Sequence, residues 1–308
     1  MINVQSKVGG RYKFTRLKAD TREVQEQTPW IKNLITDNGL DLMEPGGYTH
    51  VCAVGTGNTA PSFSDTELSG FVASTGSSNR SGTTQTSTSP FYMSQISIFE
   101  FSAGSATGNI SEVGVGASPA NLFSRALITD ESGNPITITV LSDEILRVEY
   151  ELRVEIPETD NTGTFDLDGT TYTWTARASE LNSNAWWDPT HTSSKVLQGK
   201  PFKISDRGSR IKAYEEDMIS MFDNRNFGFI YKRPSAITIE NYTSGDFSSS
   251  AEFTWGPSKG NFATGIGHIT FENDFNRLYL YQIGFSPKIP KTDLQEFKIT
   301  VSHSWGRK

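Results

Sequence analysis

Closely spaced carboxylates are the side chains in this sequence best suited to catalysis, because two acids a few ångströms apart are sufficient for polysaccharide cleavage. Arg147 and Arg153 alternate with several of these acids along one strand-like segment, which favours cross-strand ion pairing over catalysis. We therefore predict no catalytic residues and expect that the chain is not an enzyme. The acids concerned are Asp143, Glu144, Glu149, Glu151 and Glu155.

Tryptophan side chains provide a second kind of chemistry, because flat apolar rings stack on saccharides or fill a pocket of a partner protein. The candidates for ligand or interface contact lie in or near expected loops and are Trp174, Trp186, Trp187 and Trp255. An alternative for Trp186-Trp187 is that the pair anchors a long irregular segment to the core. The sequence leaves both alternatives open.

Histidine and cysteine positions predict no metal site and no cofactor. The four histidines, His50, His191, His268 and His303, lie far apart, and none has another histidine or a cysteine at metal-ligand spacing. The single cysteine, Cys52, stands in the apolar run 51–54, which indicates a buried small hydrophobe. The Asp168-Gly169 pair predicts a tight hairpin turn rather than a calcium loop.

Composition and charge narrow the class of protein. The chain has 308 residues and a formal net charge of -7, which argues against nucleic-acid binding and against a membrane-surface role. The sequence has neither a signal-peptide pattern nor an apolar run long enough to cross a bilayer. We expect no membrane insertion and synthesis in a cytoplasm.

The pattern of apolar residues predicts an all-β protein, with an antiparallel β-sandwich or barrel-like domain or domains and one or two short helices near the N-terminal third. Residues 145–156 are the clearest strand, because apolar and charged side chains alternate with a period of two. Pro157 ends this strand and suggests a division into an N-terminal β domain, residues 1–157, and a second β-rich region, residues 158–308, which could be continuous with the first.

Four segments are harder to assign. In residues 30–43, either a helix begins after Thr28-Pro29, or residues 30–35 are extended and Thr36 caps a shorter helix. A capping-box pattern at residues 64–68 predicts about two helical turns. Residues 214–222 could form a short helix. Residues 70–90 are almost wholly Ser, Thr, Gly and Asn, so we expect them to be mobile in an isolated subunit and ordered only by a neighbour.

The ordered landmarks of the first half resemble a family of tailed-bacteriophage virion proteins, the tail-fibre or minor tail structural proteins. The landmarks are residues 33–41, 53–61, 65–68, 110–115, 122–128 and 150–154. Their order and spacing carry the likeness, which fades after residue 174. The resemblance implies a non-enzymatic, oligomeric component of a tail, collar or appendage, and it transfers no catalytic residues.

Three functions follow as hypotheses. The first is a structural component of the virion that assembles with itself and with other tail proteins. The second is a receptor-binding module for a glycan or protein of the host cell surface. The third is a polysaccharide depolymerase, which the interleaved arginines disfavour.

Overall fold

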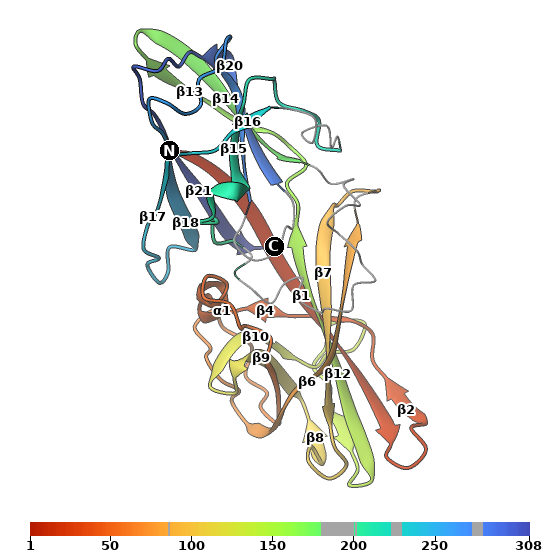
Figure 1. The fold of residues 1–308 in the computed structure, drawn as a ribbon. Coiled ribbons are helices and arrows are strands. Elements are labelled where there is room, and N and C mark those ends of the chain that lie inside the picture. Colours follow the sequence, from red (N-terminus) through yellow and green to blue (C-terminus); the bar gives the residue numbers. More distant parts are fainter. Residues whose placement is uncertain (86, 180–199, 201, 223–229, 273–279) are drawn as a thin grey trace.

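The computed structural model describes residues 1–85, 87–179, 200, 202–222, 230–272 and 280–308 (Figure 1). The all-β prediction is confirmed. Within the described residues there is one α-helix, α1 (Asp37–Leu42), and one 3-10 turn, η1 (Gly208–Arg210). None of the described helices is long and apolar enough to cross a membrane.

In the part of the chain that the structure describes, the strands form three sheets. The largest has 13 strands and follows the path β17 (Ala236–Ile239), β18 (Ser248–Trp255), β21 (Phe297–Arg307), β1 (Ile2–Lys18), β12 (Glu144–Glu155), β7 (Tyr92–Phe101), β6 (Phe71–Gln85), β5 (Val51–Gly55), β9 (Glu112–Ser118), β10 (Asn121–Leu127) and β4 (Leu34–Ile35). Two further strands of this sheet, β2 (Val24–Gln27) and β3 (Ile31–Lys32), pair with β1. The second sheet has six strands, β13 (Asn161–Leu167), β14 (Thr170–Ser179), β20 (Leu280–Ile289), β19 (Ile266–Phe271), β15 (Ile211–Tyr214) and β16 (Tyr231–Lys232). The third contains β11 (Ile138–Val140) and β8 (Gly108–Ile110).

Strand β1 runs through both halves of the molecule (Figure 1). Its even-numbered side chains Val4, Val8, Tyr12 and Phe14 are buried, as expected for a strand with one face in a core. One edge of β1 pairs with β12 from Lys7 onward, in antiparallel orientation. The opposite edge pairs in turn with β21 in parallel orientation and with β3 and β2 in antiparallel orientation. This one strand therefore belongs to two packed units.

The first sandwich, the lower half of Figure 1, forms because the large sheet folds over on itself. Strands β5, β9, β10 and β4 pack against the inner face of β1, β12 and β7. The Tyr12 hydroxyl lies 2.6 Å from the Ser124 hydroxyl across the two layers. The rings of Tyr150 and Phe123 lie 6.5 Å apart, edge to face. These contacts close a core around the middle of β12.

The second sandwich, the upper half of Figure 1, packs the six-stranded sheet against β18, β21 and the start of β1. The rings of Phe253 and Phe271 lie 6.1 Å apart across the layers, and those of Phe285 and Phe297 lie 6.2 Å apart. Most buried apolar side chains of both sandwiches belong to one core cluster, and Ala53, Leu68 and Leu122 form a small separate one. The chain connection after Pro157 leads from β12 into β13, while β21, from the end of the chain, pairs with β1 at its start.

Several local predictions are confirmed. The apolar residues of β12, from Leu146 to Val154 at every second position, are all buried. Asp168 and Gly169 have φ angles of 51° and 75°, as a primed hairpin turn between β13 and β14 requires. For residues 30–43, the second alternative is correct: Thr36 caps α1 and its hydroxyl accepts the Gly39 N–H at 2.9 Å.

Three local predictions are wrong. Residues 64–68 form no helix: Ser64, the expected cap, bonds to the Ser62 hydroxyl, and Asp65 accepts a bond from Arg125. Residues 214–222 end β15 and continue as bends and turns. Residues 71–85, expected to be mobile, form β6, because backbone pairing with β5 and β7 of the same chain substitutes for the apolar side chains that this segment lacks.

Candidate functional site

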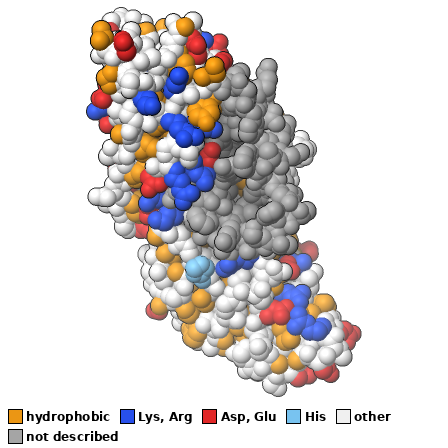
Figure 2. All heavy atoms as spheres, in the orientation of Figure 1, with side chains coloured by type: hydrophobic (Ala, Val, Ile, Leu, Met, Phe, Trp, Pro, Cys, Tyr) orange, Lys and Arg blue, Asp and Glu red, His pale blue; other side chains and the backbone are white. Residues whose placement is uncertain are grey.

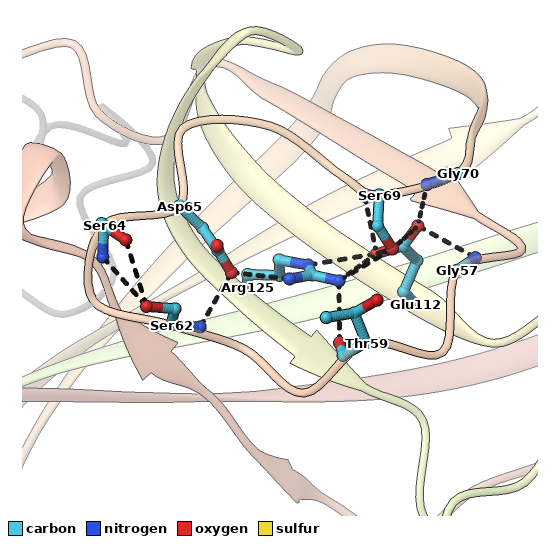
Figure 3. A network of polar contacts seen from close by, with 9 residues as sticks. All are labelled: Gly57, Thr59, Ser62, Ser64, Asp65, Ser69, Gly70, Glu112 and Arg125. Carbon is cyan, nitrogen blue, oxygen red and sulfur yellow. Dashed lines mark hydrogen bonds and ion pairs between the residues drawn. The ribbon is translucent and has the colours of Figure 1, made fainter.

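Glu112, at the start of β9, is the centre of a buried polar network (Figure 3). Its side chain is fully buried. The carboxylate accepts backbone N–H groups of Gly57, Ser69 and Gly70 at 3.0, 3.2 and 2.6 Å, and also the Ser69 hydroxyl. Three backbone donors on one carboxylate are a strong arrangement for holding a loop in place.

Arg125, on the adjacent strand β10, supplies the opposite charge and is only 2 % exposed. Its Nε and Nη2 donate to Glu112 at 3.0 and 2.7 Å, and its Nη1 donates to Asp65 at 2.6 Å. Nη2 also donates to the carbonyl of Thr59 at 2.9 Å. Burial by itself raises the pKa of Glu112, but the bonds from Arg125 and from the loop N–H groups outweigh it, so this pKa lies below its ordinary value.

This network fixes residues 56–70, which connect β5 to β6 without regular secondary structure. Glu112 holds the connection at both ends, at Gly57 and at Gly70, while Arg125 holds its middle through Thr59 and Asp65. Gly57 is required here, because a Cβ at this position would collide with Ser69 Oγ and Glu112 Oε1. Both charged groups of the Glu112–Arg125 pair already have several hydrogen-bond partners. The network is therefore better suited to holding the loop in position than to transferring a proton. Sequence reasoning missed this network, because the loop partners lie more than 40 residues from Glu112 and from Arg125 along the chain.

The acids considered as catalytic candidates form ion pairs along and beside β12, as predicted. Glu151, whose side chain is 5 % exposed, pairs with Arg11 and with Arg153. Lys13 pairs with Glu149 at 3.8 Å. The remaining pairs are Arg16–Glu144, Lys18–Asp143, Arg147–Glu100 and Lys308–Glu155. These carboxylates are therefore engaged by cations in the folded chain.

A polar groove of about 500 Å³ lies beside the start of β1. Asn3, Gln5 and Lys7 line one side, and Phe91 with residues 155–161 lines the other. Within the described part of the chain, the side chains of Gln5 and Lys7 make no hydrogen bond or ion pair. The groove thus offers an amide and an ammonium group that remain available to a polar ligand.

The predicted tryptophan contacts are not brought together. Trp255 is fully buried in β18 and donates its Nε1–H to the carbonyl of Lys232, so its prediction as a ligand or interface residue is wrong. Pro257, two residues later, indicates a loop near Trp255, but the ring of Trp255 points into the core of the second sandwich. Trp174 is half-buried in β14 and covers Gly163 of the neighbouring strand. Trp186 and Trp187 lie outside the described residues.

The histidines and the cysteine occupy mainly structural positions. Cys52 is buried, as predicted, and burial raises the pKa of its thiol. His268 and His303 are fully buried, His50 is exposed, and His191 lies outside the described residues. In the part of the chain that the structure describes, no group of three or more His, Cys, Asp or Glu side chains could hold a metal ion.

His303 gives the fold a specific pH dependence. Burial lowers its pKa from 6.5 to about 3, and its Nε2 lies 2.9 Å from Ser6 Oγ. In the unfolded chain His303 is therefore protonated below pH 6.5, whereas in the folded chain it stays neutral down to about pH 3. The stabilisation is complete above pH 6.5 and is lost as the pH falls toward 3.

We expect this group to lower the free energy of unfolding by about 1 kcal/mol between pH 6.5 and 5.5, because the unfolded histidine is already half protonated at pH 6.5. His303→Gln removes the titrating group but keeps a hydrogen-bonding side chain. Urea unfolding at pH 6.5 and 5.5 measures the slope in both proteins. A slope in the variant equal to that of the parent chain would show that His303 is not its source.

No family model, curated protein or solved structure matches this chain. The candidate sites are therefore interpreted from their own geometry.

Proposed function

We propose that this chain is a non-enzymatic structural component of a tailed-bacteriophage particle, placed in the tail, the collar or a fibre. In this role it associates with copies of itself and with other tail proteins. The resemblance of the first-half sequence landmarks to tail structural proteins supports this proposal.

The observation that carries the proposal is the contrast between a fixed interior and unpaired strand edges. The buried Glu112–Arg125 pair holds the irregular connection between β5 and β6 in place, and β1 ties both sandwiches together. In contrast, β13 and β17 are end strands of their sheets and pair on one side only with a described strand. Edge strands of this kind are templates for pairing with another chain.

Strand β17 is the less protected template, because residues 236–239 carry no charge and no proline, the usual protections of an edge. We expect the purified chain to form a homo-oligomer of 34.0 kDa subunits, measured by light scattering after size-exclusion chromatography. Thr238→Lys on this edge is expected to shift the population toward monomer. Ser132→Lys, in an exposed turn, is the matched control and leaves the mass unchanged.

A monomeric parent chain that is also missing from purified particles would contradict the proposed role. A map of the intact particle with this chain resolved would test it directly.

A second candidate function is attachment to the host cell surface, and the polar groove beside β1 favours it. The free Gln5 amide and Lys7 ammonium are groups that bind sugar hydroxyls. Binding of the purified chain to a glycan array distinguishes this function from assembly alone, because a pure assembly component binds none of the glycans.

A further inference from the structure

Lys212 and Arg233 are two cations that have no acidic partner among the residues that the structure describes. Within the described residues neither makes an ion pair, although acidic residues outnumber basic ones in the chain, 35 to 28. In the space-filling view, Lys and Arg side chains gather on the upper half of the visible face, in the region where Figure 1 places β15, β16 and η1 (Figure 2). On the outer face of β12, in contrast, the cations are paired with carboxylates.

Strand pairing brings these two cations together. Ala213 pairs with Lys232 and Tyr214 with Tyr231, so Lys212 and Arg233 come next on the two antiparallel strands and share a face with Tyr231. Like charges that face one another across a strand pair are destabilising unless something neutralises them.

Both cations lie against the ring of Tyr231. Lys212 Nζ is 4.9 Å from the ring centroid and the Arg233 guanidinium carbon is 5.6 Å from it. Arg233 Nη2 also donates to the Tyr231 hydroxyl at 3.4 Å. Tyr231 is 40 % exposed, so part of the ring remains accessible to a ligand. We call Lys212, Tyr231 and Arg233 the Tyr231 clamp.

Buried aromatic groups hold the clamp from below. Tyr231 packs edge to face on Tyr214 with centroids 6.2 Å apart, and Tyr214 stacks on His268 at 4.6 Å. His268 is fixed in turn by a 2.8 Å hydrogen bond between its Nδ1 and the carbonyl of Glu216. The exposed ring therefore rests on an ordered base, which reduces the entropy lost when a ligand binds.

We propose that the Tyr231 clamp binds an anionic saccharide, that is, a sugar carrying a phosphate or carboxylate group. The anion lies between the Lys212 ammonium and the Arg233 guanidinium, which are the donors that such groups prefer. The sugar ring stacks on the accessible part of Tyr231. This site goes beyond the assembly role and is separate from the groove beside β1.

A nucleic acid shares part of this chemistry, but the surroundings disfavour it. Glu215, Glu216 and Asp217 follow β15 directly, so the positive surface is short. A long polyanion would also meet a chain with a net charge of -7. The clamp fits a ligand with one or a few negative groups.

The test is isothermal titration of the full chain with four probes: tetragalacturonic acid, a phosphorylated lipopolysaccharide core oligosaccharide, neutral maltotetraose and the oligonucleotide dT8. We expect binding of one or both anionic saccharides, weakened by added salt, and none of maltotetraose. The double variant K212Q/R233Q is expected to lose about tenfold or more in affinity, because each charge-assisted bond contributes at least that factor. Tyr231→Ala also weakens binding, whereas Tyr231→Phe retains the ring and most of the affinity.

The matched control is K32Q/K259Q, which removes the same charge from exposed lysines elsewhere. Equal binding by K212Q/R233Q and the parent chain, or equal loss in the control, would overturn the assignment. Failure of both anionic saccharides to bind would do the same, and a preference for dT8 would reassign the clamp to nucleic acid. None of these outcomes depends on whether the chain forms oligomers.

Discussion

Replacing Arg125 by methionine is expected to lower the free energy of unfolding by about 3–5 kcal/mol, because it leaves the buried Glu112 carboxylate without its counter-charge. Glu112 is fully buried and cannot recover this interaction from water. The loop held through Asp65 and Thr59 is released at the same time. Urea unfolding at neutral pH, followed by circular dichroism, measures the change.

Companion variants separate the charge from the loop contacts. The double variant R125M/E112L removes both charges and is expected to be less destabilised than the sum of the two single variants. Lys18→Met, which breaks the exposed pair with Asp143, is the control and is expected to have little effect. If R125M were no less stable than this control, the network would not be fixing the loop.

Trp255→Ala is the second large effect, with an expected loss of about 3–5 kcal/mol in the free energy of unfolding. The ring is fully buried and packs 5.7 Å from Phe297 and 6.4 Å from Phe253, so its removal leaves a cavity between the sheets of the second sandwich. The lost Nε1 hydrogen bond leaves the Lys232 carbonyl without this donor. Thermal unfolding of the variant measures the loss.

Trp174→Ala is the natural comparison, because Trp174 is half-buried on the hairpin of β13 and β14. A smaller loss is expected there. Equal losses at the two positions would contradict the distinction between a core tryptophan and an edge tryptophan.

The strands were predictable where local pattern decides the structure. From Leu146 to Val154 of β12 every second side chain is apolar, and this period of two indicates a strand with one buried face. The Asp168-Gly169 turn was predictable for the same reason, since its chemistry is contained in two adjacent residues. For residues 30–43, the helix cap at Thr36 was one of two alternatives, because cap patterns alone do not exclude a longer helix that begins after Thr28-Pro29.

The sites were not predictable because they depend on contacts between distant residues. Nothing near Glu112 in the sequence indicates Gly57 or Gly70 as a partner, and Asp65 lies inside the segment 64–68 for which the pattern predicts a helix. The Tyr231 clamp depends on the pairing of β15 with β16, which sequence periodicity does not reveal. Strand β6 was missed because its stability comes from backbone pairing, to which side-chain composition is a poor guide.

The parallel pairing of β1 with β21 has a mechanical consequence. Ile2 to Val8 lie in register with Val301 to Arg307, and the two strands run in the same direction. Tension that pulls the start of β1 and the end of β21 apart therefore acts along the strands and loads their backbone hydrogen bonds in shear. These bonds share the force instead of opening one at a time, so we expect the pair to resist rupture under a load that would unzip a hairpin.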